Sequence, residues 1–145
     1  MKIAVLNGPN LNLLGERQPE IYGSDTLAEI ETKVRASLND PLIDMVFEQT
    51  NDEGEMITWI QDAARSWGCT GIVLNPGAWA HYSIAVMDAI ASISIPVVEV
   101  HLSNTAAREE FRHRSITAAE AVGKIEGLGW TGYLLAIQYL MSSPE

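Results

Sequence analysis

The residues best suited to chemistry in this sequence follow the apolar runs. A polar segment, residues 7–23, comes directly after the first run and carries Asn10, Arg17 and Tyr22, which supply an amide, a fixed cation and a phenol. A phenol ionises near pH ~10 and is a poor base at neutral pH, but a neighbouring guanidinium stabilises its phenolate. The pair Arg17 and Tyr22 is therefore a sensible base, although most tyrosines are structural. We expect residues 7–23 to be a lid over an active site, because long connections in compact domains are usually lids, binding loops or disordered.

Glu99 and His101 form a second candidate pair. Because they are two positions apart on a predicted strand, their side chains leave it on the same face. One interpretation is a carboxylate that fixes the tautomer and charge of a catalytic imidazole. The other is that the two groups only satisfy each other at a strand end, and the spacing does not decide between them. Zinc bound by Glu99, His81, His101 and His113 is a weaker interpretation, since these are zinc-ligand types but no HxxxH or HExxH pattern is present.

An anion site is indicated where residues 101–104 lead into a predicted short helix. Free backbone N–H groups at a helix start attract an anion. Ser103 or Asn104 is also a suitable N-cap, and both uses can coexist. In a chain whose formal net charge is −10, basic residues then gather in one segment: Arg108, Arg112, His113 and Arg114. That cluster indicates a local site for a small anion, while a lone arginine such as Arg112 is by default a surface residue.

Two other patterns resemble reactive motifs and are set aside. Residues 127–132 match GxGxxG, the dinucleotide fingerprint, which needs a following strand with an acidic residue about twenty positions on. The sequence ends before such a strand, so tight turns and close packing explain these glycines better. Cys69 lies at a predicted helix-to-strand turn, at the opposite end of the sheet from the other candidates. Free cysteine is usually a small buried hydrophobe, and we interpret Cys69 in that way.

Composition bounds the class of protein. A length of 145 residues fits one globular domain over residues 1–145. The net charge of −10 argues against nucleic acid or an anionic membrane as a partner. No apolar run approaches the roughly 18 residues of a membrane span, and no signal peptide is recognisable. The single cysteine excludes an intrachain disulfide and fits a reducing, cytoplasmic location.

Apolar runs alternate with helical patterns along the chain. Strands are predicted near residues 2–6, 43–48, 71–74, 96–100 and 119–125. Helices are predicted from a capping box at Thr26 and Glu29, and near residues 55–67, 82–92, 105–111 and 129–140. This alternation favours an α/β fold with a five-stranded parallel sheet and helices on both faces. Ligands bind beyond the carboxyl ends of such strands, and the candidates fall there: Asn10, Arg17, Tyr22, Asn75, His81, His101 and Ser103.

Several long segments together resemble the type II 3-dehydroquinate dehydratase family. They read NGPNLNLLGERQPEIYG, QTNDEG, NPGAWAH, EVHLSN, REEFRH and GLGWTGY, at residues 7–23, 49–54, 75–81, 99–104, 108–113 and 127–133. The resemblance covers nearly the whole chain. It implies a flavodoxin-like three-layer sandwich and the reversible dehydration of 3-dehydroquinate to 3-dehydroshikimate through an enolate, in the shikimate pathway. It also implies no metal, no cofactor, and a homo-oligomer that is usually a dodecamer built from trimers.

The resemblance also implies catalytic roles for particular residues. Tyr22 would remove the proton α to the ketone, and Arg17 would help to keep Tyr22 as a phenolate. Asn10 would hold the water that stabilises the enolate. His101 would protonate the departing hydroxyl, and Glu99 would orient His101.

Further roles implied by the resemblance concern substrate binding. Asn75, Leu102 and Ser103 would hold the substrate carboxylate through side-chain and backbone donors. His81 and Arg112 would bind ring hydroxyls. Asp88 would reach the site of a neighbouring subunit.

A few positions depart from the family's usual pattern. The sequence has Gln18, Thr50, Asp52 and Met87 where the family commonly has a glutamate, a serine, a histidine and an arginine. None of these four residues carries an implied catalytic role.

The alternative function is a non-enzymatic flavodoxin-like module that binds a small anionic ligand. Such a module would have no use for His101 and Tyr22 together, and a receiver would need acids after the first strand, where residues 7–10 have none.

Overall fold

The computed structural model describes residues 1–142, so the predicted domain of residues 1–145 extends slightly beyond it. Within that range, five parallel strands form one sheet in the order β2-β1-β3-β4-β5. The strands are β1 (Lys2–Asn7), β2 (Asp44–Gln49), β3 (Gly71–Asn75), β4 (Val97–His101) and β5 (Gly123–Glu126). The predicted five-stranded parallel sheet is confirmed.

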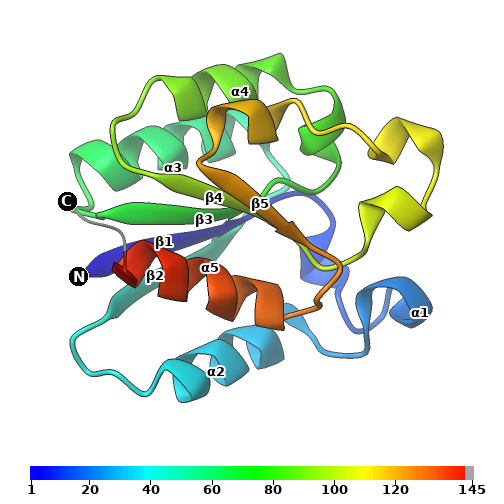
Figure 1. The fold of residues 1–145 in the computed structure, drawn as a ribbon, viewed down its shortest axis with the longest axis horizontal. Helices are drawn as coiled ribbons and strands as arrows, with labels where there is room; N and C mark the ends of the chain where they lie inside the picture. The colour runs from blue at the N-terminus through cyan, green and yellow to red at the C-terminus, as the bar shows by residue number, and fades with distance from the viewer. Residues whose placement is uncertain (143–145) are drawn as a thin grey trace.

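Helices cover both faces of this sheet (Figure 1). Helices α2 (Leu27–Leu38) and α5 (Thr131–Ser142) pack on one face, and α3 (Glu53–Arg65) and α4 (Ile84–Ala91) pack on the other. Strand β1 is buried on both faces, because Ile3 and Val5 belong to the core under α2 and α5 while Ala4 and Leu6 belong to the core under α3 and α4. A strand buried on both faces needs a continuous apolar run rather than alternation, which is the pattern that the sequence shows there.

Side-chain caps fix where three of the helices begin. The Thr26 hydroxyl accepts a hydrogen bond from the Glu29 N–H, and the Glu29 carboxylate accepts one from the Thr26 N–H, so the predicted capping box is present. Helix α3 begins earlier than predicted, because Asp52 caps it by accepting from the Glu55 N–H. Ser83 caps α4 in the same way, through the Val86 N–H.

Three predictions of secondary structure were wrong in detail. The predicted strand near residues 119–125 begins too early, because residues 119 and 120 belong to a 3-10 turn, η5 (Thr117–Glu120), and β5 starts only at Gly123. The predicted helix near residues 105–111 is two 3-10 turns, η3 (Thr105–Ala107) and η4 (Glu110–Arg112), because Arg108 between them is extended. The predicted loop of residues 7–23 contains the turn η1 (Leu11–Leu13) and the short helix α1 (Pro19–Tyr22).

The segments at the carboxyl ends of the strands gather at one end of the molecule (Figure 1). Helix α1 and residues 105–112 lie there, away from the N-terminus. Strand β1 lies between β2 and β3, so the chain changes direction across the sheet at the β1–β3 pair, where Asn7 is opposite Asn75. Open α/β sheets bind ligands at such a switch point. No helix within residues 1–142 is long and apolar enough to cross a membrane.

Candidate active site

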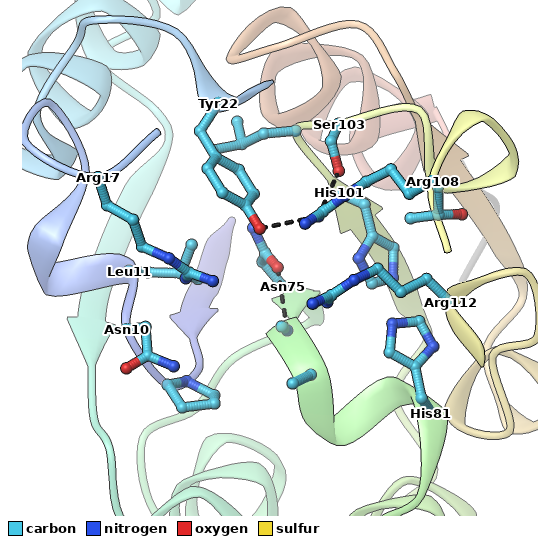
Figure 2. A pocket seen from close by; sticks show the side chains of 15 residues that line it. Asn10, Leu11, Arg17, Tyr22, Asn75, His81, His101, Ser103, Arg108 and Arg112 are labelled. Atoms are coloured by element: carbon cyan, nitrogen blue, oxygen red, sulfur yellow. Dashed lines mark hydrogen bonds between the residues drawn. The ribbon is translucent and has the colours of Figure 1, made fainter. Parts of the chain in front are cut away.

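A pocket of about 210 Å³ opens at the carboxyl edge of β1, β3 and β4. Most residues singled out from the sequence line it: Asn10, Arg17, Tyr22, Asn75, His81, His101, Leu102, Ser103 and Arg112 (Figure 2). Glu99 lies behind His101, fully buried, and does not line the pocket. Asp88 is exposed on α4 and does not line it either. The lining is mainly polar and carries several cationic groups, which suits a small anion with hydroxyl groups.

Two arginines approach the Tyr22 phenol in different ways (Figure 2). The Arg17 guanidinium lies over the ring, 5.0 Å from its centroid, and Arg108 lies 5.1 Å from the same centroid. Of the two, Arg108 contacts the phenol oxygen: its Nη1 donates to Tyr22 Oη at 2.8 Å and to Ser103 Oγ at 3.3 Å. Tyr22 therefore lies in contact with two cationic side chains. The sequence places Arg108 in the basic cluster but indicates no role for it, because sequence spacing does not show which arginine reaches a side chain on another loop.

One N–H donor of the Arg108 guanidinium lacks a hydrogen-bond acceptor in the described structure. Its Nε is buried and finds no acceptor among residues 1–142. The guanidinium carries five N–H donors in a fixed fork, and a buried donor without an acceptor is costly. An anionic ligand in the pocket is a suitable acceptor for this group, so Arg108 belongs with the lining residues that favour an anion.

The segment that carries Tyr22 adopts an unusual backbone. Asn10 has φ +67° and Gln18 has φ +39°, in the left-handed region that few residues other than glycine adopt. Gln18 is the residue before α1, and Pro19 follows at the first helical position, where a missing N–H does no harm. The Asn10 N–H donates to Asn51 Oδ1 at 2.9 Å, which ties the start of the segment to the loop after β2.

Asn75 is held by a chain of buried hydrogen bonds. Its Oδ1 accepts from the Gly77 N–H at 3.2 Å, and its Nδ2 donates to Tyr133 Oη at 2.8 Å. The Tyr133 hydroxyl in turn donates to Asn7 Oδ1 at 2.6 Å. Burial raises the pKa of Tyr133 well above its usual value, so its hydroxyl stays protonated and remains a donor. These contacts fix which end of the Asn75 amide faces which partner.

Replacing Tyr133 with phenylalanine is expected to destabilise the fold by about 1–3 kcal/mol, because Asn7 and Asn75 would each lose a buried partner. Urea unfolding measures this as a lower midpoint at an unchanged slope. The matched control is Tyr82→Phe, since Tyr82 is 62% exposed. Equal midpoints for the two variants would contradict a structural role of this buried chain.

His101 and Glu99 are in direct contact. The distance between His101 Nε2 and Glu99 Oε1 is 2.7 Å, and His101 is only 7% exposed. Since an ionised carboxylate can only accept, His101 Nε2 carries the proton in this bond, and Nδ1 is the ring nitrogen left for other partners. His81 stacks on His101 with its centroid 6.3 Å away, and its Nδ1 donates to the Arg114 carbonyl oxygen at 2.8 Å.

The four residues of the alternative zinc site, Glu99, His81, His101 and His113, are not arranged around a common point. His113 Nε2 contacts the backbone carbonyl of Arg108 at 2.9 Å, away from the His101–Glu99 pair. Across the described part of the chain, no group of three His, Cys, Asp or Glu side chains is arranged to hold a metal ion. The carboxylate of Glu99 is occupied by hydrogen-bond donors. A pair that orients an imidazole is the interpretation that this geometry supports.

Arg112 projects toward the pocket from η4 (Figure 2). Its Nε donates to the Glu109 carboxylate, and this bond holds the pKa of Glu109 below its usual value. With Arg17 and Arg108 it makes the pocket cationic, although the chain as a whole is strongly acidic. The prediction of a local anion site is consistent with this arrangement.

The fold and the pocket define an α/β protein with a small-molecule site at the switch point of a parallel sheet, equipped with a phenol and an imidazole. The chain matches the family model described as dehydroquinase class II over residues 1–141. It therefore belongs to that family, and the resemblance inferred from its motifs is confirmed.

Relatives and solved structures agree with this assignment. The chain is 52% identical to a 3-dehydroquinate dehydratase from Bacillus licheniformis, covering 97% of this chain and 96% of that protein. It is 54% identical to one from Bacillus subtilis, covering 95% and 92%. A type II dehydroquinase crystal structure from Propionibacterium acnes superposes with a TM-score of 0.92 at 44% identity, covering 98% of this chain and 97% of that one. The predicted flavodoxin-like fold is confirmed by this similarity.

Proposed function

We propose that this chain is a hydro-lyase that catalyses the reversible dehydration of 3-dehydroquinate to 3-dehydroshikimate, in the shikimate pathway. The observation that carries the proposal is one pocket in which a phenol between two guanidiniums faces an imidazole bound to a buried carboxylate. Family membership and relatives that carry the name 3-dehydroquinate dehydratase support it. The catalytic unit is the single domain of residues 1–145.

The first step uses the cationic side of the pocket. Tyr22, as phenolate, takes the proton from the carbon α to the ketone, and the electron pair moves onto the ketone oxygen to form an enolate. Arg108 and Arg17 stabilise the phenolate that this step needs. A water held by Asn10 stabilises the enolate oxygen, where charge develops.

The second step expels the hydroxyl group β to the ketone. The enolate electrons re-form the ketone and make the carbon–carbon double bond, while His101 donates a proton so that the hydroxyl leaves as water. Glu99 holds His101 in the orientation for this transfer and balances the charge of its protonated ring. These two steps use side chains for acid, base and charge stabilisation, so the proposal includes no metal and no cofactor.

Substrate binding is assigned to the remaining lining residues. Ser103 and Leu102, at the carboxyl end of β4, and Asn75, at the end of β3, are buried and line the pocket next to one another, and we assign the substrate carboxylate to them. His81 and Arg112, which lie near His101 (Figure 2), bind ring hydroxyls.

The direct test is an assay of the purified chain for dehydration, with the product followed by its enone absorbance. Turnover of 3-dehydroquinate without added metal is the expected result. Binding of the substrate without any enone signal would instead favour a non-enzymatic anion-binding module and overturn the proposal. Sizing the same sample tests the proposed homo-oligomer, a dodecamer built from trimers, in which Asp88 reaches the site of a neighbouring subunit. The proposed location is the cytoplasm.

Arg108→Met is expected to lower kcat about ten- to a hundredfold, because the phenol oxygen loses a charge-assisted hydrogen bond. The matched control is Arg114→Met, which removes one exposed cation from the same segment outside the pocket lining. Steady-state kinetics of both variants measure the difference. If both variants keep the activity of the original chain, the contact between Arg108 and Tyr22 is irrelevant to the reaction.

A further inference from the structure

We propose that the hydroxyl groups of Thr117 and Ser115 are positioning groups for proton donation by His101. They act through Glu99, which they hold ionised and correctly oriented behind the imidazole. This inference rests on the proposed role of His101 as the general acid. Neither residue lines the pocket, and neither belongs to a motif that carried the family resemblance.

The buried end of Glu99 is surrounded by donors. The Ser115 hydroxyl donates to Oε1 at 2.6 Å, and the Thr117 hydroxyl donates to Oε2 at 2.6 Å. His101 Nε2 shares Oε1 at 2.7 Å. Glu99 and Thr117 are both 0% exposed, so water does not replace a lost partner easily. Both oxygens of the carboxylate are therefore satisfied by groups that donate.

Such surroundings select the charged form of the carboxyl group. A neutral carboxyl would point its own proton at a donor and would lose one of these hydrogen bonds. Burial alone raises the pKa of Glu99, but the bond and charge of His101 and the bonds from Ser115 and Thr117 outweigh it, and the pKa is lowered overall. Without the hydroxyls, burial would act with less opposition, and Glu99 would take up a proton at higher pH.

The charge of Glu99 determines whether His101 is oriented and stabilised as a proton donor. An ionised Glu99 accepts from Nε2–H, which leaves Nδ1 for the pocket and stabilises the protonated ring that donates to the substrate. If Glu99 took up a proton, the protonated ring would lose its counter-charge and the orientation of His101 would loosen. Acid catalysis would then fail at low pH, although the pocket-lining residues would be unchanged.

Thr117 is the better residue to test because its hydroxyl makes fewer other hydrogen bonds than that of Ser115. Ser115 Oγ also accepts from the Ala118 N–H at 3.1 Å, so it helps to build the turn η5. The Thr117 hydroxyl has Glu99 as its hydrogen-bond acceptor and lies 3.1 Å from Ser115 Oγ. Valine has nearly the same shape as threonine, so Thr117→Val removes the hydroxyl with little change in packing.

The other charged groups near Glu99 are accounted for. On the neighbouring strand, Lys124 is opposite Glu99 in the register, and its Nζ lies 3.5 Å from Glu126. Glu126 also accepts from the Thr105 hydroxyl. His81 stacks on the ring of His101, and Glu120 at the end of η5 is exposed. Among these titratable groups, His101 is the one in direct contact with Glu99.

The experiment compares Thr117→Val with Thr117→Ser and with the control Thr70→Val, whose hydroxyl donates to the Lys2 carbonyl at the far end of the sheet. For Thr117→Val we expect kcat to fall about tenfold. The acid limb of its pH profile should move up by about one pH unit, with KM changed little. Thr117→Ser keeps a hydroxyl and should restore both. Thr70→Val should keep the original profile.

A lower melting temperature with an unmoved acid limb would show a structural role only and would overturn the inference. Should Thr117→Val fail to fold, 13C NMR of the Glu99 carboxyl group in the unaltered enzyme supplies the second test. The pKa of that carboxyl is expected to lie below that of an ordinary glutamate, because His101, Ser115 and Thr117 donate to it, and a carboxyl that takes up its proton above the ordinary value would overturn the inference. Because NMR needs no turnover, its result is independent of whether the chain dehydrates 3-dehydroquinate.

Discussion

Replacing Tyr22 with phenylalanine is expected to lower kcat about a thousandfold, which is within the range that a general base contributes. The variant loses only the phenol oxygen, which is the atom that accepts from Arg108 Nη1 at 2.8 Å. The ring itself stays between the guanidiniums of Arg17 and Arg108, so the shape of the pocket changes little. KM should therefore change far less than kcat, since the lost interaction is made with the reacting atoms.

The measurement is steady-state dehydration, followed by the enone absorbance of the product, with substrate binding measured separately by calorimetry. Tyr82→Phe is the matched control, because Tyr82 is exposed and lies outside the pocket. It should keep the original kcat. Full activity of Tyr22→Phe would remove the phenol from the mechanism and leave Arg108 and Arg17 with a role in anion binding alone.

Much of this site was predictable because parallel sheets place their functional loops at one edge. Tyr22 follows β1, Asn75 ends β3, and His101 ends β4, and the structure brings them to one pocket. The contact between Glu99 and His101 was also predictable, because alternate residues of a strand share a face. The reaction itself was not derivable from this geometry. It came from the resemblance of long motifs to one family, which the family model supports.

The contacts of Arg108 and Thr117 were not predictable from spacing. Arg108 meets a phenol 86 positions earlier in the chain, and Thr117 meets Glu99 18 positions earlier. Both contacts depend on the backbone conformation of segments that are neither regular helix nor strand. A helix was predicted near residues 105–111, but the extended backbone at Arg108 divides this segment into two turns. A strand was predicted to begin near residue 119, yet residues 117–120 form a turn, in which the Thr117 hydroxyl donates to Glu99.

The two halves of the proposed reaction can be separated at His101. In His101→Gln, the amide keeps an N–H that can face Glu99, so the buried carboxylate is not left without a partner on that side. The amide cannot donate a proton as an acid. Dehydration is therefore expected to fall about a thousandfold, while Tyr22 and its two arginines remain in place.

Proton exchange tells the two halves apart. In D2O, His101→Gln should still exchange the hydrogen on the carbon α to the ketone, because the proposed mechanism forms the enolate with Tyr22 and without His101. Proton NMR of the substrate follows this exchange over a long incubation, with Tyr22→Phe giving the background rate. Exchange in His101→Gln that is no faster than in Tyr22→Phe would mean that proton removal also requires His101, and the separate assignment of base and acid would be wrong. Faster exchange without dehydration would place His101 after the enolate, in the step where the hydroxyl group leaves.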